Sequence, residues 1–332
     1  MEMKTLLLNK SEIGSLIDLD RVRDAVEDGY RSFNSGQVVQ PNFMHVAWPG
    51  THEGFDFKCG LDMGSELITI KSSSGGYSKN PELGLPRGMN TVLLFDAKTS
   101  FLKCVMDGTW ITGCRTAAAG AISVKCLARP DASRLAVIGA GNQARQQLRA
   151  IARVRGLREV LAWNENRDRL NDYVQEMSAE TGLPIRACAT AEEAVRAADI
   201  IVTTTRGRRG PVVQKEWLRP GTHIAVIGSD MPDKQEISAD IFAGAKVVND
   251  STELCLANGD THQAVKQGFI RREDIHAEIG EILLGKKPGR ETPEEITVFH
   301  SVGMAIQDVA TAGMLYQGAL EKGLGVWYDL LA

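Results

Sequence analysis

Short apolar runs alternate with longer helical patterns between about residue 130 and residue 300. The runs in "RLAVIG", "REVLAWN", "AADIIVTTTRG", "HIAVIGSD" and "AKVVNDS" each stop at small or polar residues. Continuous apolar runs are typical of strands that are buried on both faces of a parallel sheet. Their alternation with helices predicts one doubly wound α/β domain in this part of the chain.

The first 130 residues follow a different pattern, in which an amphipathic helix precedes short strand-like runs. The helix is predicted over 16–36, and Gly36 ends it. Strand-like runs are predicted at 55–58, 66–71 and 91–96, and a turn at Asp107 and Gly108 leads into a helix of small residues. This part therefore predicts an α+β domain. The apolar positions that share one face of the first helix are Leu19, Val22, Ala25, Val26, Tyr30 and Phe33.

A glycine-rich turn joins the first predicted strand of the α/β domain to a helix that runs to about residue 154. Its form, G-x-G-x-x-A, is that of a dinucleotide-binding fingerprint. Gly139 would make the tight turn, Gly141 would let the backbone approach a pyrophosphate, and Ala144 would let the helix pack closely on the strand. The amino end of the helix offers N–H groups to phosphates. The predicted cofactor-binding loop is Gly139, Ala140, Gly141, Asn142, Gln143 and Ala144.

The end of the next predicted strand is where the adenosine ribose of a dinucleotide would lie. Asn164, Glu165 and Arg167 follow that strand. An acidic side chain favours the free ribose of NAD, whereas a basic one can accept the 2′-phosphate of NADP, so the two signals oppose each other. We expect NAD(H) to be preferred, with NADP(H) as the alternative. The ends of the following two strands add Thr203, Thr205 and Gly228 to the predicted cofactor site.

The composition of the chain argues against several classes of partner and site. The chain has 332 residues, 43% of them hydrophobic, which is enough for two domains with cores of their own. Because 38 basic residues balance 42 acidic ones, no nucleic-acid partner is expected. The chain has no apolar run of membrane-spanning length and no signal-peptide pattern, so we expect a cytoplasmic protein with no membrane partner. Six scattered cysteines and six dispersed histidines show no metal-ligand spacing, and no metal is expected.

Five ordered motifs span nearly the whole chain. They are "IKSSSGGYSKNPELGLP", "MDGTWITGCRTAAAGA", "VIGAGNQARQQ", "GSDMPDKQEI" and "FHSVGMAIQDVA". With them the sequence resembles the ornithine cyclodeaminase/mu-crystallin family, which includes archaeal-type alanine dehydrogenases and imino acid reductases. The resemblance implies a homodimer. It also implies a substrate-binding and dimerisation domain of residues 1–125 and 305–332, into which a Rossmann NAD(P)-binding domain of residues 126–304 is inserted.

The resemblance also implies roles for individual residues. Lys71 and Arg115 resemble the ligands of a substrate carboxylate, and Asp230 resembles the acid that handles the substrate amine or imine. Many relatives carry a basic residue soon after a proline near position 41, which "QPNFMHVAW" lacks. Lys58 is expected to replace it, at the α-carboxylate or at a second acidic group. The implied cofactor contacts are Thr91, Arg115, Thr116, Asn142, Gln143, Lys234 and Ser301.

Three functions agree with these residues. The first is an NAD(P)-dependent dehydrogenase or imine reductase of small α-amino or α-imino acids, because hydride transfer at the α-carbon needs a pinned carboxylate and an oriented nitrogen. The second is an ornithine cyclodeaminase, which releases ammonia and recycles its NAD. The third is an NADPH-dependent small-ligand binding protein like mu-crystallin. Purely structural roles are the alternative for the residues themselves: a surface pair for Arg115, a solvated Lys71 and a helix cap for Asp230.

Overall fold

The computed structural model describes residues 4–51, 53–86 and 88–332. The chain forms two compact units. One, the split unit, contains the residues up to Arg115 together with Met304–Ala332, and the other, the inserted unit, is Thr116–Gly303. The division after Arg115 and the expected division after residue 125 both fall within helix α3 (Thr109–Leu127). Within the described part of the chain, none of the helices combines the length and apolar character that crossing a bilayer requires.

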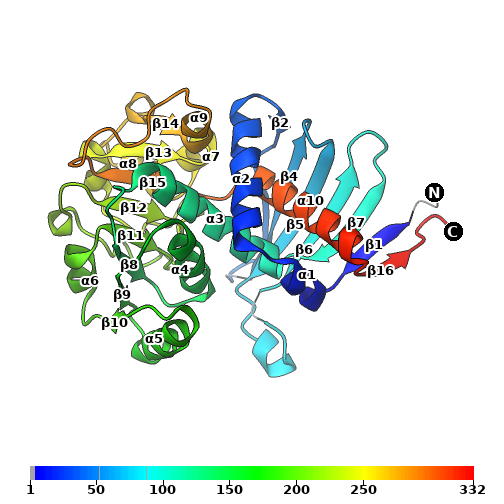
Figure 1. Ribbon diagram of the computed structural model, residues 1–332, viewed down its shortest axis with the longest axis horizontal. Coiled ribbons are helices and arrows are strands. Elements are labelled where there is room, and N and C mark those ends of the chain that lie inside the picture. The colour runs from blue at the N-terminus through cyan, green and yellow to red at the C-terminus, as the bar shows by residue number, and fades with distance from the viewer. Residues whose placement is uncertain (1–3, 52, 87) are drawn as a thin grey trace. The chain divides into compact units, whose positions relative to one another are not determined.

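The inserted unit is built on an eight-stranded sheet with the order β10-β9-β8-β11-β12-β15-β13-β14 (Figure 1). Every described strand pair in it is parallel. The chain proceeds outward from β8 in one direction through β9 and β10, and then in the other through β11 and β12. The predicted doubly wound parallel sheet is therefore confirmed. The strands are β8 (Arg134–Ile138), β9 (Glu159–Trp163), β10 (Ile185–Ala187), β11 (Ile200–Thr203), β12 (His223–Val226), β13 (Lys246–Asn249), β14 (Ala277–Glu278) and β15 (Thr297–His300).

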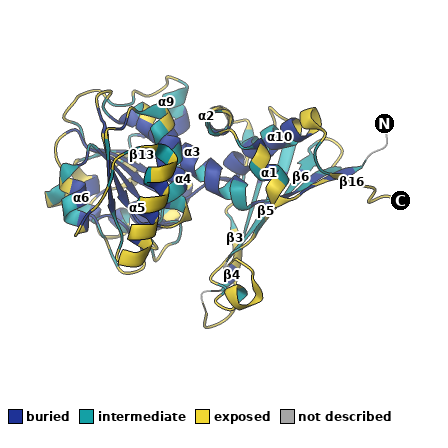
Figure 2. Ribbon diagram, turned by 60° about the horizontal axis from the view of Figure 1, so that its bottom comes forward, coloured by how far each residue is buried: buried dark blue, intermediate teal, exposed yellow. Residues whose placement is uncertain are grey.

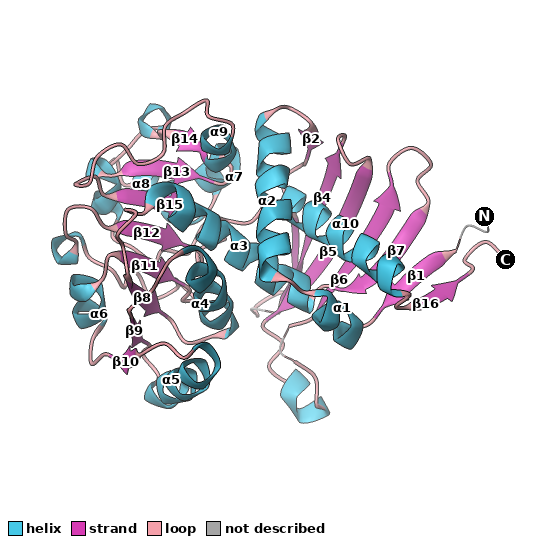
Figure 3. Ribbon diagram, viewed as in Figure 1, coloured by secondary structure: helices cyan, strands magenta, loops and turns pink. Residues whose placement is uncertain are grey.

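Helices cover this parallel sheet (Figure 3). Its central strands are fully buried, as Val137, Ile201, Ile224 and Val298 illustrate, whereas the outer side of α5 is exposed (Figure 2). Burial on both sides is the reason that these strands carry continuous apolar runs. The helices, beside the end of α3, are α4 (Asn142–Val154), α5 (Arg167–Thr181), α6 (Ala191–Ala197), α7 (Thr252–Ala257), α8 (Gly259–Lys266) and α9 (Ile279–Leu283), with short 3₁₀ turns η2 (Lys215–Trp217), η3 (Ala239–Gly244) and η4 (Arg272–Asp274).

The split unit contains a second eight-stranded sheet, with the order β16-β1-β7-β6-β5-β4-β2 and with β3 paired to β4. The pairs are antiparallel except for β1 with β7. All three predicted strand-like runs lie in it, and β4 and β5 extend well beyond them. The strands are β1 (Thr5–Leu8), β2 (Val38–Val39), β3 (Met44–Ala47), β4 (Gly54–Asp62), β5 (Leu67–Gly75), β6 (Asn90–Asp96), β7 (Leu102–Asp107) and β16 (Val326–Tyr328), with the 3₁₀ turn η1 (Asn80–Leu83) between β5 and β6.

Helices α1 (Lys10–Leu16), α2 (Leu19–Asn34) and α10 (Ala305–Lys322) lie on one side of this sheet (Figure 2). The predicted amphipathic helix is α2, which begins where the Asp18 side chain accepts from the N–H groups of Asp20 and Arg21. Its Val22, Val26 and Tyr30 side chains are fully buried. The C-terminal helix α10 packs on β4, β5 and β6, so the last segment of the chain completes the core of the first.

Candidate active site

A row of neighbouring residues crosses the helix-covered face of the split unit's sheet. It runs from Leu8 through Met106 and Val92 to Lys71 and Lys58, one residue from each of five adjacent strands. The first three side chains are buried and apolar, and Lys71 is only 1% exposed. Two lysines directly opposite each other on paired strands repel and destabilise the sheet. A charged pair at the end of a buried apolar row therefore indicates a functional site.

Lys71 and Arg115 share one buried carboxylate, that of Asp308 in the first turn of α10. The Lys71 Nζ atom lies 2.9 Å from both oxygens of Asp308. The Arg115 Nε atom donates to the same carboxylate at 3.1 Å. Arg115 is 5% exposed and Asp308 is fully buried. The structural alternatives of a solvated Lys71 and a surface pair for Arg115 are therefore wrong.

Gln307, the neighbour of Asp308, ties this cluster to the rest of the split unit. Its Oε1 atom accepts from Arg115 Nη1 at 2.8 Å and from the N–H of Met304 at 2.9 Å. Its Nε2 atom donates to the hydroxyl of buried Tyr30 at 2.6 Å. The guanidinium of Arg115 is thus held by two side chains of α10, which fixes its orientation.

Among the described residues, the buried cluster has more positive than negative charge, since Lys71 and Arg115 both contact the carboxylate of Asp308. Lys58 is a further cation that acts on both Lys71 and Asp308. Burial, followed by the nearby Arg115, lowers the pKa of Lys71 to about 7, although Asp308 opposes this shift. Burial would raise the pKa of Asp308, but Lys71 and Arg115 overcome that effect and hold it below its usual range. A charged Asp308 and an excess of buried cations form a site that an anion would stabilise.

Sequence reasoning singled out Lys58, Lys71 and Arg115 but not Asp308 or Gln307. Both lie in the quoted motif "FHSVGMAIQDVA". The available signal was a polar pair within a helix whose neighbouring residues Ile306, Val309 and Ala312 are fully buried. Lys58 itself lies over the ring of Phe43, with 5.1 Å between Nζ and the ring centre.

In the inserted unit, the loop between β8 and α4 has the geometry that the fingerprint predicts. Gly139 has φ +120°, and a Cβ there would lie 2.6 Å from Thr204 Oγ1, so the fold itself needs glycine at this position. At Gly141, by contrast, a Cβ would meet no described atom within 4 Å. Helix α4 begins at Asn142, which Gln143 follows, and no described side chain caps it. Ala144 in its first turn is fully buried. An open backbone at an uncapped helix start fits a pyrophosphate.

The residues after β9 are held by contacts of their own. Arg167 donates to the carbonyl oxygens of Cys188 and Ala189 at 2.8 and 2.7 Å. Glu165 forms an exposed ion pair with Arg209 at 2.6 Å, and Asn164 donates to the Asn166 carbonyl at 2.9 Å. The guanidinium of Arg167 thus ties the start of α5 to the end of β10. A 2′-phosphate could bind this guanidinium only in competition with the two carbonyl oxygens.

Thr203, Thr205 and Gly228 converge on the carboxylate of Glu236. The Thr203 and Thr205 hydroxyls donate to it at 2.7 and 2.8 Å, and the N–H of Gly228 donates at 2.6 Å. Burial raises the pKa of Glu236, although these hydrogen bonds oppose the shift. Glu236 therefore joins the carboxyl ends of β11 and β12. The predicted cofactor contacts of the three residues stay predictions.

Replacing Glu236 with alanine is expected to lower the free energy of unfolding by about 3 kcal/mol, because buried donors at the ends of β11 and β12 lose their acceptor. Urea denaturation measured by circular dichroism checks this. Glu216→Ala, at an exposed position of η2, is the matched control and should change stability by less than about 0.5 kcal/mol. Equal stabilities of the two variants would contradict the role given to Glu236.

Asp230 lies just beyond the end of β12, and its side chain is 49% exposed and paired with Lys234. Residues 231–238 contain no helix, so the interpretation of Asp230 as a cap for the next helix is wrong. Burial lowers the pKa of the nearby His300. Its Nδ1 atom shares a hydrogen bond of 2.8 Å with the Thr261 hydroxyl, and its Nε2 atom lies 3.1 Å from the Ser229 carbonyl oxygen. It fixes the backbone next to Asp230.

The other predicted cofactor contacts are scattered over both units. Thr91 is exposed at the start of β6, and strand alternation directs its side chain to the face opposite Val92 and Lys71. The Thr116 carbonyl accepts from Gln147 Nε2 at 3.0 Å. The Ser301 hydroxyl donates to the buried Asp250 at 2.7 Å. Their cofactor roles stay predictions.

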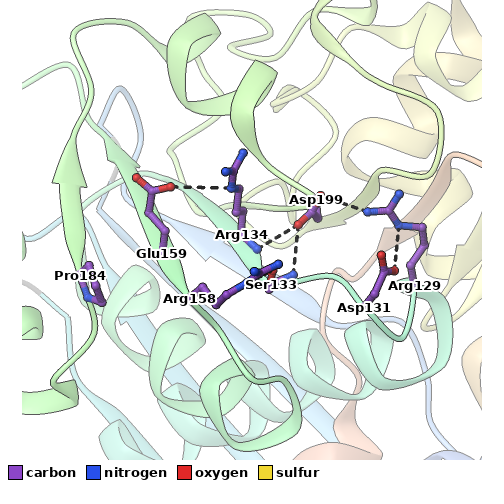
Figure 4. Close-up of a pocket in the computed structure, with 8 residues that line it drawn as sticks. All are labelled: Arg129, Asp131, Ser133, Arg134, Arg158, Glu159, Pro184 and Asp199. Atoms are coloured by element: carbon purple, nitrogen blue, oxygen red, sulfur yellow. Dashed lines mark hydrogen bonds and ion pairs between the residues drawn. The ribbon is translucent and has the colours of Figure 1, made fainter.

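A polar cavity of about 450 Å³ lies elsewhere in the inserted unit (Figure 4). Arg134 and Glu159 line it at the amino ends of β8 and β9, whereas ligands of open α/β sheets lie beyond the carboxyl ends. Asp199 accepts there from Arg129 at 3.1 Å and from the N–H groups of Ser133 and Arg134. These contacts join loops, so the polar residues that line the cavity have structural roles.

No group of three or more His, Cys, Asp or Glu residues in the described ranges could hold a metal ion.

The family model of the ornithine cyclodeaminase/mu-crystallin family matches residues 3–323. The alanine dehydrogenase of Archaeoglobus fulgidus is 39% identical over 325 residues, which cover 97% of this chain and 98% of that protein. Both comparisons extend over the split and the inserted unit.

Two solved structures are similar over nearly their full length. One is the Thermococcus litoralis Δ1-pyrroline-2-carboxylate reductase in complex with NADH and L-proline, with a TM-score of 0.92, 36% identity and coverage of 97% of this chain and 99% of that chain. The other is an archaeal alanine dehydrogenase dimer with bound NAD, with a TM-score of 0.93, 38% identity and coverage of 99% and 100%. With the family model and these relatives in agreement, the chain belongs to the ornithine cyclodeaminase/mu-crystallin family.

Proposed function

We propose that this protein is an NAD(H)-dependent oxidoreductase of small α-amino and α-imino acids. The observation that carries the proposal is the buried cluster of Lys71, Arg115 and Asp308, whose excess positive charge suits a substrate carboxylate. The dinucleotide loop at Gly139–Ala144 lies in the same chain. Relatives named as an alanine dehydrogenase and a pyrroline-2-carboxylate reductase support this reaction class.

Each proposed role follows from the chemistry of the side chain. Arg115 presents a fixed, planar set of donors that matches a carboxylate, and Lys71 adds a point charge beside it. Lys58, on the strand next to Lys71, extends the cationic surface. Asp230 accepts or holds the proton of the substrate nitrogen, for which a half-exposed carboxylate is suited. When bound, the nicotinamide supplies or accepts the hydride at C4.

NAD(H) is the proposed cofactor, with NADP(H) disfavoured. Glu165 carries a negative charge at the end of β9, where a 2′-phosphate would be repelled and would compete with Glu165 for its ion-pair partner Arg209. Arg167, the other basic residue nearby, is engaged by the carbonyls of Cys188 and Ala189. The alanine dehydrogenase and the pyrroline-2-carboxylate reductase described above hold NAD and NADH in their structures, which supports the same choice here.

The test is a nicotinamide absorbance assay with NADH and NADPH. The substrates are pyruvate with ammonia, glyoxylate with methylamine, oxaloacetate with ammonia, and Δ1-pyrroline-2-carboxylate, with ornithine and ammonia detection in a parallel arm. Consumption of NADH by one of the imino acids supports the proposal. Ammonia from ornithine without net absorbance change would establish a cyclodeaminase instead. Tight NADPH and ligand binding without any turnover would favour the binding-protein alternative.

We also propose that two copies of the chain associate through the sheet face that α1, α2 and α10 leave uncovered. A row of apolar residues crosses that face, from Leu7 through Val105, Leu93 and Ile70 to Cys59. Leu7 is 38% exposed and the other four are partly exposed in the single chain. A continuous apolar sheet face in water favours a partner, and the alanine dehydrogenase dimer supports a second copy as that partner.

Replacing Leu93 with glutamate is expected to convert a dimer into a monomer at micromolar concentration, because the interface would have to bury an unpaired carboxylate. Light scattering after gel filtration measures the mass. Ser11→Glu, at an exposed position of α1, is the charge-matched control and should stay dimeric. A dimeric Leu93→Glu variant would place the interface on another surface.

A further inference from the structure

The first turn of α10 places a permanent negative charge between the two cations to which the substrate carboxylate is assigned. Asp308 contacts Lys71 with both oxygens and Arg115 with one, and none of these three residues is more than 5% exposed. A bound substrate carboxylate would therefore share its cations with Asp308. Such an arrangement needs a reason, since a fixed carboxylate competes with the anion that the site is built to hold.

We propose that Asp308 is a positioning residue that favours the protonated form of Lys71 and orients Arg115 in the empty site, and that binding of an α-carboxylate is coupled to uptake of a proton by the fraction of Lys71 that is still neutral. This inference rests on the proposed function, because it takes the Lys71 and Arg115 pair as the carboxylate site. It assigns to Asp308 a role that acts through Lys71 and Arg115 and requires no contact with substrate.

The surroundings of Lys71 explain why its protonated form requires a stabilising carboxylate. In the part of the chain that the structure describes, the charged groups that act on Lys71 are Asp308 from α10, Arg115 from α3 and Lys58 from β4. Two of the three are cations, and the apolar Val92 lies beside Lys71 on the next strand. Without Asp308, burial and the two cations would lower the pKa of Lys71 further, so that it is mostly neutral at neutral pH. A neutral amine attracts a carboxylate only weakly.

The direction of the coupling follows from the same charges. The pKa of Lys71 in the empty site is about 7, so a large share of the lysines is neutral at neutral pH. A second carboxylate beside Nζ raises this pKa, and the complex therefore binds more protons than the free protein does. The affinity for the carboxylate is highest when the pH is below the pKa that Lys71 has in the empty site. It falls as the pH rises through that pKa, by up to tenfold per pH unit.

The alternative is that Asp308 serves only as a counter-ion that the substrate displaces from the cations. The two hypotheses predict opposite effects of removing Asp308 on the affinity for a carboxylate at and above neutral pH. As a mere competitor, Asp308 would weaken carboxylate binding at every pH, and its removal would tighten binding throughout. As a positioning residue, it strengthens binding where Lys71 would otherwise lose its proton, which is at and above neutral pH.

The experiment is calorimetric titration of the NADH-saturated protein with pyrrole-2-carboxylate, a planar carboxylate that cannot be reduced in this reaction, between about pH 5.5 and 9. For the wild type we expect a Kd that is constant below about pH 7 and rises above it. Titrations in buffers of different ionisation enthalpy should show uptake of nearly one proton at about pH 8. In Asp308→Asn the rise should start about one pH unit lower, with Kd roughly tenfold weaker at pH 8 and no weaker at pH 5.5.

Two further variants keep the result interpretable. Asp62→Asn makes the same substitution in the split unit at a carboxylate that binds Ser32 and Ser65, and it should leave the pH profile unchanged. Lys71→Arg, whose charge persists at all these pH values, should remove the pH dependence. Thermal unfolding and NADH affinity, which reports on the inserted unit, show whether each variant is folded.

The outcomes separate this inference from the proposed function. Tighter binding by Asp308→Asn at every pH, an unshifted profile, or wild-type binding without proton uptake would each overturn the inference, even if the enzyme reduces imino acids. Proton-coupled binding of pyrrole-2-carboxylate by a protein that turns over none of the tested substrates would support the inference and refute the proposed function.

Discussion

Arg115→Met should lower kcat/KM for the imino acid substrate by about 100- to 1,000-fold, the largest loss expected from a single side chain of the split unit. The variant removes a buried guanidinium that Asp308 and Gln307 hold in one orientation. A substrate carboxylate would lose a fixed pair of donors, and Asp308 would be left with Lys71 as its neighbour. Steady-state kinetics with the substrate identified in the absorbance assay measure the loss.

Arg115→Lys separates the role of charge from the role of geometry. It keeps the positive charge but loses the planar donor set, so we expect a partial recovery, to within about tenfold to 100-fold of the wild type. Arg21→Met, at an exposed position of α2, is the matched control and should keep full activity. A wild-type kcat/KM in Arg115→Met would remove Arg115 from the substrate site. A change confined to the Kd for NADH would assign it to the cofactor instead.

Gly141→Val should abolish measurable NADH binding, with a Kd at least about 100-fold higher, while the protein without cofactor stays folded. The backbone at Gly141 has φ −87°, which any residue adopts. Since a Cβ there would meet no described atom within 4 Å, the added side chain would occupy the space through which a pyrophosphate approaches. NADH fluorescence titration and thermal unfolding without cofactor measure the two effects.

Gly139→Val is the contrasting variant, because glycine is needed there by the fold. Its positive φ and the 2.6 Å approach to Thr204 Oγ1 would force the backbone to move. We expect a loss of roughly 2 to 4 kcal/mol in unfolding free energy, so NADH binding and stability fall together. If Gly141→Val instead lost stability and kept its affinity for NADH, the nucleotide loop would have to be placed elsewhere.

The sequence by itself determined the features that depend on short stretches of chain. The strand, glycine turn and helix around Gly139–Ala144 follow one another directly, and burial of the parallel strands on both faces makes each of them a continuous apolar run. The amphipathic pattern of α2 was visible for a similar reason, since Val22, Val26 and Tyr30 recur at the helical period. The five ordered motifs identified the family because each is a local string of residues.

Only the tertiary structure decided which charges meet. Asp308 is 237 positions from Lys71 and 193 from Arg115, and Glu236 is 33 positions from Thr203. Local periodicity predicts that a residue lies on a helix or strand, but not which distant element packs against it. The strand register that sets Lys58 beside Lys71, and the packing of α10 on β5, bring the charges together. Burial then moves the pKa of Lys71 towards neutrality, because desolvation depends on all of the surrounding atoms.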